Sequence, residues 1–394
     1  MLNKMRLLTP GPTPLPEEVR LAMARDMIHH RKAEFLPVMQ DVRAGLKYLF
    51  QTSQEVMPLS CSGTGAMAAA VTNLFSPGEK ILCIEGGKFG ERWGEICDMH
   101  GQIPVRMAVE WGQAVDPQAV KAALDADPSI TGVCVQASET STGVLHPVKE
   151  LAQVTKGIGG RDVLLVVDGI SAVGISPCPM DAWELDCLLT GSQKGLMLPP
   201  GLAFIACSDK AWAKCATVKP ANFYFQLAGE REKISKNQTM FTSSVGLLVG
   251  LRESMRLFTE FGLENLFRKQ WALTMMAREG AEAMGLELLA PDSFTWGLTA
   301  IKMPLGVDGS AVVKAASNDY GVVLAAGQGH MKDQVVRLGH MGHVDFGDVL
   351  AGLAAFREAF VASGGYVSCP DCLERAMNAY VQAMKSGPPA HLCA

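Results

Sequence analysis

Short apolar runs alternate with longer amphipathic segments through the first two thirds of the chain. Most of these runs lack the alternating polar positions of a half-exposed strand, and helix-period stretches separate them, which is typical of parallel strands covered on both faces. We expect strands at 56–60, 80–84, 103–107, 132–137, 163–167, 186–189 and 202–206. We expect helices between them at 66–75, 116–126 and 148–156. The pattern therefore predicts an α/β fold, doubly wound around a mainly parallel sheet of about seven strands.

A different pattern begins after a long helical stretch at 244–259. Beyond it we expect a smaller α+β domain, with strands near 299–303 and 335–338 and helices at 309–320 and 346–363. The length of 394 residues also favours two domains, because a single core stops growing near ~250–300 residues. We expect an N-terminal segment at 1–14, a large domain at 15–255 and a small C-terminal domain at 256–394.

The composition excludes several classes of protein. The chain carries 35 Lys and Arg against 40 Asp and Glu, so no basic surplus exists to collect the phosphates of a nucleic acid. No apolar run approaches the ~20 residues that span a bilayer, and none near the N-terminus resembles a signal peptide. The 11 cysteines are scattered singly, which favours reduced thiols over a disulfide framework. We therefore expect a cytoplasmic protein with neither nucleic-acid nor membrane partners.

The strongest local signal is the stretch TGSQKGLMLPPG at 190–201, in which Lys194 follows an expected strand by a few residues. A lysine at the carboxyl end of a buried strand is costly unless it reacts or pairs, because burial penalises its charge. The same burial lowers the pKa of the amine and frees it for Schiff-base chemistry. Lys194 is therefore a candidate catalytic residue, although the stretch by itself also fits a surface lysine in a loop.

The expected strand at 163–167 runs directly into Asp168. Taken alone, this carboxylate fits a metal ligand, a helix cap, a ribose contact or a partner for the protonated nitrogen of a pyridine ring. The last of these keeps the ring cationic, which lets pyridoxal phosphate act as an electron sink. Asp168 and Lys194 stand at the ends of consecutive strands, and ligands of such sheets bind beyond the carboxyl ends of the strands.

Small residues join another expected strand to a helix in the stretch SGTGA at 62–66. Free backbone N–H groups at a helix start, together with Ser and Thr hydroxyls, make a site for an anion. No lysine follows the glycines, so this is not a Walker loop, and the spacing is not the Gly-x-Gly-x-x-Gly of a dinucleotide fold. A tight turn with a Ser or Thr cap is the alternative interpretation.

Taken together, these stretches resemble the class V aminotransferases, within the fold-type-I pyridoxal-phosphate enzymes. The chain is most similar to the alanine–glyoxylate and serine–glyoxylate (serine–pyruvate) aminotransferase group. The matching stretches are TPGPTPLP at 9–16, SGTG at 62–65, ETSTGVL at 139–145, VDGISA at 167–172, GSQKG at 191–195, PPG at 199–201 and VRLGHMG at 336–342. Each stretch is short, but their order and spacing together are highly specific.

The resemblance implies pyridoxal 5′-phosphate as the cofactor. Lys194 would carry it as a Schiff base and then move a proton between substrate and cofactor, and Asp168 would pair with the pyridinium nitrogen. Phe89 lies where the family stacks an aromatic ring on the cofactor, and Thr140 would donate to its phenolic oxygen. The residues implied in holding the phosphate are Ser62, Gly63, Thr64 and Gln193, with Thr242 reaching it from the neighbouring subunit.

The resemblance further implies Gly11 and Arg337 as substrate-binding residues, with the guanidinium of Arg337 gripping an α-carboxylate. The expected reaction moves an amino group from a small amino acid, alanine or serine, to glyoxylate or another 2-oxo acid. Family members are homodimers that share the active site, so a homodimer is expected here. Thr239 and Thr64 depart from the Tyr and His that some relatives use at the phosphate.

Several alternative functions stay open at this point. Transamination of 2-aminoethylphosphonate or of aspartate uses the same fold and cofactor. A hydrogenase-associated accessory subunit is an alternative of another class, although intact Lys194, Asp168 and Arg337 favour catalysis. Cysteine desulfurases share the fold but carry a histidine before the lysine, where this chain has Gln193.

No metal is expected, although His330, His340 and His343 lie close together in the sequence. The Gly-His-Met-Gly run resembles the family's stretch after its carboxylate-binding arginine, and no Cys or carboxylate cluster completes a set of ligands nearby. Cys369 and Cys372 form a single Cys-x-x-Cys pair, which is weak support for a redox or zinc role.

Overall fold

The structure, a computed structural model, describes residues 4–219 and 222–392. Its central feature is a seven-stranded sheet in the order β2-β10-β9-β8-β5-β3-β4. Neighbouring strands are parallel except at β10, which is antiparallel to both β2 and β9. The strands are β2 (Val56–Leu59), β3 (Lys80–Glu85), β4 (Ile103–Ala108), β5 (Ile130–Gln136), β8 (Leu164–Asp168), β9 (Cys187–Gly191) and β10 (Ala203–Cys207). The predicted mainly parallel sheet is confirmed, with every strand end within two residues of its expected place.

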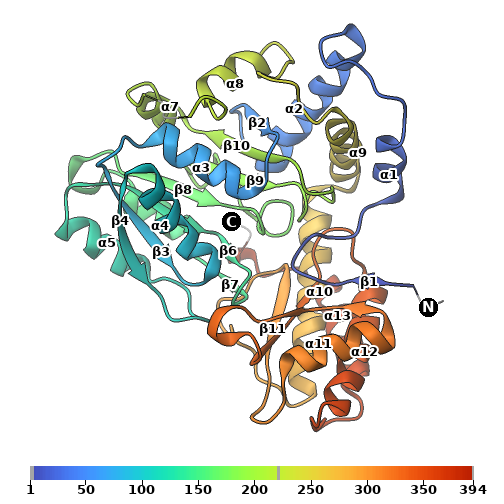
Figure 1. The fold of residues 1–394 in the computed structure, drawn as a ribbon. Helices are drawn as coiled ribbons and strands as arrows, with labels where there is room; N and C mark the ends of the chain where they lie inside the picture. The colour runs from blue at the N-terminus through green and yellow to red at the C-terminus, as the bar shows by residue number, and fades with distance from the viewer. Residues whose placement is uncertain (1–3, 220–221, 393–394) are drawn as a thin grey trace.

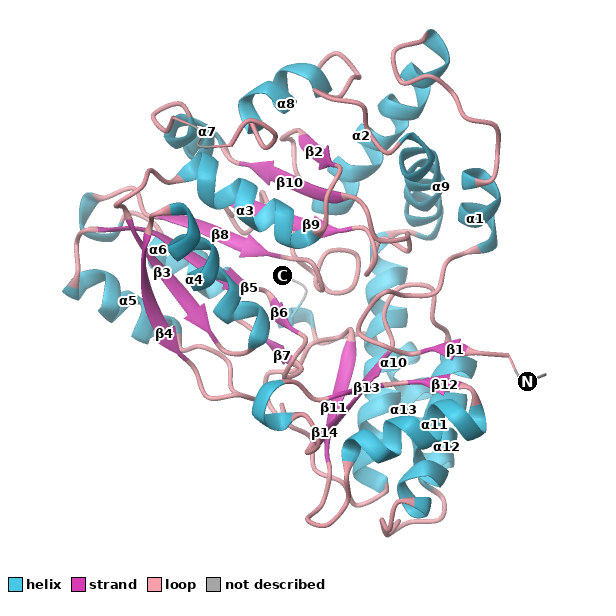
Figure 2. Cartoon of the chain, in the orientation of Figure 1, coloured by secondary structure: helices cyan, strands magenta, loops and turns pink. Residues whose placement is uncertain are grey.

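Helices cover this sheet. Every residue of β2, β8, β9 and β10 is buried, so both faces of these strands are shielded from water. On one face α3 (Gly63–Leu74) and α4 (Lys88–His100) contact the strands and each other, and they cross in front of the sheet in Figure 1. Other helices of this part are α2 (Leu36–Phe50), α5 (Pro117–Ala126), α6 (Val148–Thr155), α7 (Asp209–Cys215) and α8 (Leu227–Ile234). Figure 2 shows the strands enclosed among these helices.

Helix α3 begins three residues earlier than the sequence pattern indicates, at Gly63 rather than residue 66. Its first turn consists of Gly63, Thr64 and Gly65, residue types that favour a helix only weakly, so the pattern places the start too late. Packing explains the glycine at the start, because a Cβ atom on Gly63 would lie 2.2 Å from Cδ1 of Ile170. The close approach brings the helix start against the loop after β8.

The C-terminal part has its own hydrophobic cluster and an antiparallel sheet in the order β11-β14-β13. Its strands are β11 (Leu298–Lys302), β13 (Ala325–Ala326) and β14 (Val335–Gly339). Its helices are α10 (Leu263–Ala283), α11 (Gly309–Tyr320), α12 (Phe346–Ala362) and α13 (Cys372–Ser386). The helix expected at 244–259 is α9 (Val245–Phe261), and Gly262 alone separates it from α10. The predicted elements of this part are found, whereas α10 and α13 were not among them.

The start of the chain joins this C-terminal part. Strand β1 (Arg6–Leu7) pairs in parallel with β12 (Val322–Val323), as Figure 1 shows where blue meets orange. The carbonyl oxygen of Leu8 then accepts a hydrogen bond of 2.7 Å from the N–H of Gly339. Residues 9–16, here named the N-terminal strap, lead from this strand to α1 (Glu17–Met23).

Two short strands, β6 (Ser138–Glu139) and β7 (Val144–Leu145), form an antiparallel hairpin after β5. Across the two described ranges, no helix is both long and apolar enough to cross a membrane.

Candidate active site

Candidate residues from distant parts of the sequence meet at one edge of the central sheet. Asp168 is the last residue of β8 and is paired in register with Leu189 of β9. Lys194 lies in the turn that follows β9. Because β8 and β9 are parallel neighbours, both side chains lie beyond the same strand ends, where ligands of such folds bind. This edge is the candidate active site.

The N-terminal strap encloses Lys194. Its Nζ donates a hydrogen bond to the carbonyl oxygen of Pro10, and a Cβ atom on Gly11 would lie 2.7 Å from the same Nζ. Thr13 holds the turn, since its hydroxyl donates to the carbonyl oxygen of Lys194 over 3.0 Å. The N–H of Thr13 also donates to the carbonyl oxygen of Gln193 over 3.2 Å. The strap therefore fixes both the backbone and the amine of Lys194.

Burial governs the ionisation of Lys194 and Asp168. It lowers the pKa of Lys194 to about 8, an effect that the Asp168 carboxylate opposes and the Arg337 cation reinforces. Asp168 is 4% exposed, and burial raises its pKa to about 7. A hydrogen bond of 2.8 Å from the N–H of Ile170 opposes that rise, and the like charge of Glu139 adds to it. Both groups therefore change protonation near neutral pH, as acid–base chemistry requires.

The first turn of α3 lies at the same edge, because it follows the carboxyl end of β2. Ser62 is the N-cap residue, with an extended backbone, and Gly63 packs on the loop after β8. The hydroxyl of Thr64 accepts a hydrogen bond of 3.0 Å from Nη1 of Arg92. Backbone N–H groups at the start of a 12-residue helix, with a hydroxyl and a guanidinium beside them, have the chemistry of an anion site.

Phe89 is held by a buried carboxylate that the sequence pattern did not reveal. Oε2 of Glu139 accepts hydrogen bonds from the N–H groups of Phe89 and Gly90 over 3.1 and 2.8 Å. Oε1 of Glu139 accepts another from the N–H of Ser141 over 3.0 Å. Burial raises the pKa of Glu139, and these hydrogen bonds oppose the rise. Glu139 thus caps the start of α4 and fixes Phe89, whose ring lies 5.0 Å below the guanidinium of Arg92.

A second missed residue is Arg92 itself. It stands between two predicted cofactor residues, bonding to Thr64 and lying over Phe89. In the first turns of an amphipathic helix, the sequence does not distinguish an arginine that faces a site from an arginine that faces solvent. For Glu139 a signal did exist, because it lies three residues after the buried strand β5, and a charged residue is seldom fully buried without a task.

Arg337 connects the C-terminal part to this edge. Its side chain comes from β14, is 6% exposed, and donates from Nε to the carbonyl oxygen of Ala326 over 2.9 Å. Nη1 donates to the carbonyl oxygen of Thr140 over 2.8 Å. Burial lowers the pKa of Arg337 to about 10, and the Glu139 carboxylate opposes this shift. Arg337 therefore remains a cation at neutral pH, in an orientation set by two backbone oxygens.

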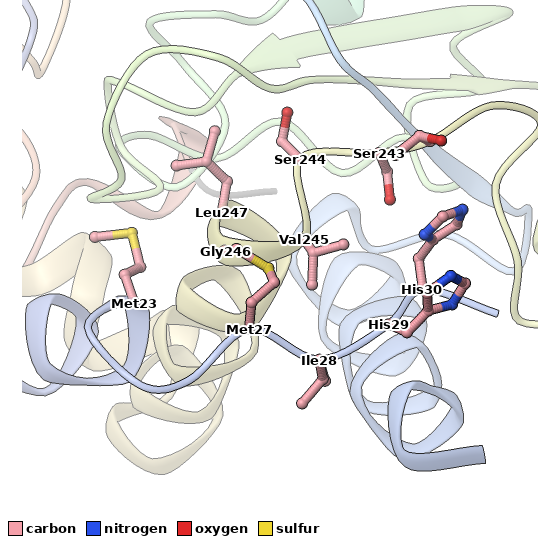
Figure 3. Close-up of a pocket in the computed structure, with 11 residues that line it drawn as sticks. Met23, Met27, Ile28, His29, His30, Ser243, Ser244, Val245, Gly246 and Leu247 are labelled. Carbon is pink, nitrogen blue, oxygen red and sulfur yellow. The ribbon is translucent and has the colours of Figure 1, made fainter. Parts of the chain in front are cut away.

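Gln193 and Thr242 lie in different surroundings. Oε1 of Gln193, beside Lys194, is buried and has no hydrogen-bond partner within the described ranges. Thr242 is exposed in the single chain and lies outside the contacts around Lys194. It lines a surface cavity of about 870 Å³ with His29, His30 and Ser243, and Figure 3 shows how these last three face it. Its contact with the phosphate of a neighbouring subunit stays a prediction.

The histidines singled out in the sequence do not gather into one cluster. Within residues 4–219 and 222–392, no group of three or more His, Cys, Asp or Glu could hold a metal ion. His340 is fully buried, with Nε2 3.0 Å from the hydroxyl of Thr299, and burial lowers its pKa to about 3. Cys369 and Cys372 are free thiols.

The fold and the site define the chain as a fold-type-I pyridoxal-phosphate enzyme. The family model described as aminotransferase class-V matches residues 9–344, and the chain belongs to this family of pyridoxal-phosphate-dependent aminotransferases.

Similar curated proteins carry different functional names. The soluble hydrogenase small subunit of Synechococcus sp. is 38% identical, over 93% of this chain and 96% of that one. An L-aspartate–glyoxylate aminotransferase of Paracoccus denitrificans is 33% identical over 90% of each chain, and a serine–glyoxylate aminotransferase of Methylorubrum extorquens is 33% identical over 92% of each.

Solved structures give the same fold. The ureidoglycine–glyoxylate aminotransferase of Bacillus subtilis aligns with a TM-score of 0.91 at 25% identity, covering 97% of this chain and 99% of that one. The aspartate aminotransferase of subgroup IV from Thermus thermophilus aligns with a TM-score of 0.84 at 32% identity, covering 91% and 99%. The expected family and fold class are therefore confirmed.

The residues at the edge fit pyridoxal phosphate. Asp168 is a buried carboxylate with a raised pKa, and a ring cation beside it would stabilise its charge. The N-terminus of α3 offers backbone N–H groups of the kind that bind a phosphate. The ring nitrogen and the phosphate of the cofactor thus each find a complementary group at this edge.

Proposed function

We propose that this aminotransferase moves an amino group from alanine or serine to glyoxylate or another 2-oxo acid. The Paracoccus and Methylorubrum relatives, whose names give aspartate and serine as donors, share glyoxylate in their names. The observation that carries the proposal is the buried guanidinium of Arg337, fixed by two hydrogen bonds and close enough to Lys194 to lower its pKa. A cation at that place suits the α-carboxylate that amino acids and 2-oxo acids have in common.

Each residue around the edge has a task in this proposal. Lys194 would hold the cofactor through its amine, and Asp168 would pair with the ring nitrogen. Phe89 would stack on the ring, and Thr140 would donate to its phenolic oxygen. The residues that would bind the phosphate are Ser62, Gly63 and Thr64 at the start of α3, with Gln193 beside Lys194.

The chemistry needs a proton to leave the α-carbon of the substrate. The bound cofactor supplies an electron sink for the electron pair left behind. Lys194 takes that proton, because its lowered pKa keeps a share of the amine neutral near pH 8. Asp168 holds the proton on the ring nitrogen through its negative charge. Arg337 fixes the carboxylate and so limits the orientations in which the Cα–H bond can face Lys194.

The N-terminal strap favours small donors. The carbonyl oxygen of Pro10 accepts a hydrogen bond from the amine of Lys194. Gly11 lies so close to Lys194 that even a Cβ atom on it would overlap the lysine side chain. A large substrate side chain near Lys194 would meet the same strap. Gly11 therefore acts in substrate binding through the space that it leaves, which supports alanine and serine over bulkier amino acids.

We further propose a homodimer in which Thr242 reaches the cofactor phosphate of the partner subunit. Thr242 is exposed in the single chain, and Oγ of the adjacent Ser243 is buried without a partner among the described residues. A second chain against this surface would give the exposed hydroxyl of Thr242 a partner. All ten cysteines that the structure describes are free thiols, which supports the cytoplasm as the compartment.

Aspartate is the second candidate donor, and the name of the Paracoccus relative is the observation in its favour. 2-Aminoethylphosphonate is a third, for which a phosphonate takes the place of the carboxylate at Arg337. A hydrogenase-associated role rests on the name of the Synechococcus relative. It is compatible with catalysis, because Asp168 and Arg337 are buried and a partner protein would bind the outer surface.

The test is a visible absorption spectrum of the purified protein, followed by titration with alanine, serine, aspartate and 2-aminoethylphosphonate. The expected result is a yellow band that alanine or serine bleaches and that glyoxylate then restores. Bleaching by aspartate or by the phosphonate alone would move that donor to the front. A protein that stays colourless after added pyridoxal phosphate would contradict the roles proposed for Lys194 and Asp168.

A further inference from the structure

A second cavity, of about 590 Å³, adjoins the N-terminal strap. Its walls come from β1, the strap, α1, α10 and the start of α12. The ionisable residues that line it are Lys4, Arg6, Glu17, Arg20, Lys269, His343, Asp345 and Asp348. None of the residues proposed to hold the cofactor or the substrate lines it. The volume lies in the range of small-molecule sites, and the walls are unusually rich in charge.

Two of the carboxylates in these walls already pair with other groups of the protein. Asp345 accepts a hydrogen bond of 2.9 Å from the N–H of Asp348, and Asp348 accepts one of 3.4 Å from the N–H of Asp345. This pair caps the start of α12. Asp348 also lies 3.6 Å from Nε of Arg6. Their negative charge is therefore balanced by the helix start and by one arginine.

Three of the cations, Lys4, Arg20 and Lys269, have no such arrangement, and the two on helices carry the argument. The side chains of Lys269 on α10 and Arg20 on α1 make neither a hydrogen bond nor a salt bridge with any residue in the described ranges. Burial lowers the pKa of Lys269, and the carboxylates of Asp345 and Asp348 oppose this shift from a distance. Lys269 is therefore a partly buried cation without a direct partner, which is costly and is a feature of sites that await an anion. Arg20 is exposed and adds a second positive charge to the walls.

We propose that this cavity binds a small dianion, a dicarboxylate or a phosphate, between Lys269 and Arg20. The two cations come from separate helices and line one cavity, so a ligand with two negative charges can pair with both. Glu17, in the first turn of α1, is the remaining acidic residue in the walls.

The N-terminal strap connects this cavity to the active site. Thr13 lines the cavity while its hydroxyl holds the carbonyl oxygen of Lys194. On the opposite wall, Gly342 precedes His343, and a Cβ atom on Gly342 would lie 3.1 Å from the same carbonyl oxygen. An anion between α10 and α1 therefore lies against the segments that position Lys194.

The experiment measures binding of malonate and of inorganic phosphate by calorimetry, using cofactor-loaded protein that carries Arg337→Ala. That substitution removes the carboxylate grip of the active site, and the cofactor fills the phosphate site, so only the cavity remains to be titrated. We expect one anion per chain, and an additional Lys269→Met to weaken its binding at least tenfold. Lys314→Met, on the exposed face of α11, is the matched control and leaves binding unchanged.

Arg20→Met is the second test, because Arg20 is exposed on a short surface helix and its replacement does not threaten folding. It should weaken the same anion at least tenfold. Binding of only malonate or only phosphate supports the site and identifies the class of ligand. Absence of both, or equal affinity in both variants, overturns the proposal. Failure of the aminotransferase proposal would show in the spectral titration with amino donors and leave this binding unchanged.

Discussion

Nη1 of Arg337 donates a hydrogen bond of 2.8 Å to the carbonyl oxygen of Thr140, a residue 197 positions earlier in the chain. The bond joins β14 of the C-terminal part to the turn between β6 and β7. Nε of Arg337 bonds to Ala326 at the same time, so two backbone oxygens set the plane of the guanidinium. The remaining N–H groups are therefore presented in one direction before any substrate arrives.

Arg337→Lys should raise the KM for amino donors about ten- to a hundredfold, because an ammonium cannot reproduce both backbone bonds and a bidentate grip worth roughly 1.5–3 kcal/mol. The effect on kcat should be smaller. Steady-state kinetics with serine and glyoxylate measure both constants. Arg357→Lys, on α12 beside Glu358, serves as the control. An unchanged KM in Arg337→Lys would show that Arg337 does not bind the substrate carboxylate.

Lys194→Ala should abolish turnover while the fold persists. In the unaltered enzyme, kcat should rise with pH toward about 8, because the amine of Lys194 is free only after substrate has displaced it from the cofactor, and its neutral form becomes populated as the pH approaches its lowered pKa. A pH–rate profile measures this limb. Lys121→Ala, at a surface ion pair with Asp125, should behave as the unaltered enzyme. Retained turnover in Lys194→Ala would contradict the catalytic role proposed for Lys194.

Asp168→Asn should stabilise the cofactor-free protein at high pH. The folded-state pKa of about 7 lies above the ordinary 3.8, so the folded state holds its proton longer and stability falls as pH rises from 3.8 to 7. Above pH 7 the variant should gain about 4 kcal/mol, and the gain should vanish toward pH 4. Urea unfolding at pH 5 and pH 8 measures it.

Asp181 provides the control of opposite sign. Despite its partial burial, hydrogen bonds from Thr52 and Ser53 lower the pKa of Asp181. Asp181→Asn should therefore lose stability, and lose most above the ordinary pKa of 3.8, where the unaltered carboxylate is charged in both states. Equal behaviour of the two variants would show that burial does not govern Asp168.

Gly11→Ala should reduce activity severely without unfolding the protein. Gly11 has φ of +121°, and its added Cβ would lie 2.6 Å from Cδ of Lys194. Gly364→Ala is the control that has the backbone strain without the steric overlap. Its φ is +90°, and nothing lies within 4 Å of the added Cβ atom. Both variants carry backbone strain, so their melting temperatures should fall alike. Turnover should fall only in Gly11→Ala, and a parallel loss in Gly364→Ala would contradict the steric explanation.

Glu139→Gln should shift the pH dependence of cofactor binding. The Glu139 charge raises the pKa of Asp168, so its removal should move the midpoint of binding to lower pH. The new amide would also place an NH2 group, a second donor, against the N–H of Ser141. The lost hydrogen bond should cost about 1–3 kcal/mol in stability. Spectral titration with pyridoxal phosphate at several pH values measures the midpoint. A purely structural role would lower stability and leave the midpoint in place.

Residues at strand ends could be predicted because the signal is local. Buried parallel strands have nearly continuous apolar runs, so Asp168 and Lys194 stand out where those runs stop. Glu139 and Arg92 were missed because their partners, Phe89 and Thr64, lie some tens of residues away and only the fold brings them together. The division of the chain at 14/15 and 255/256 stays a prediction.

The strap over Lys194 has a consequence for synthesis on the ribosome. Strand β1 and the strap behind it are translated first. Their C-terminal partners, Val322 beside Arg6 and Gly339 beside Leu8, are translated near the end. A nascent chain can complete its large sheet while the edge around Lys194 still lacks both its cover and Arg337. Closing such a long loop is slow. Catalytic competence therefore arises among the last steps of folding, after nearly the whole chain has left the ribosome.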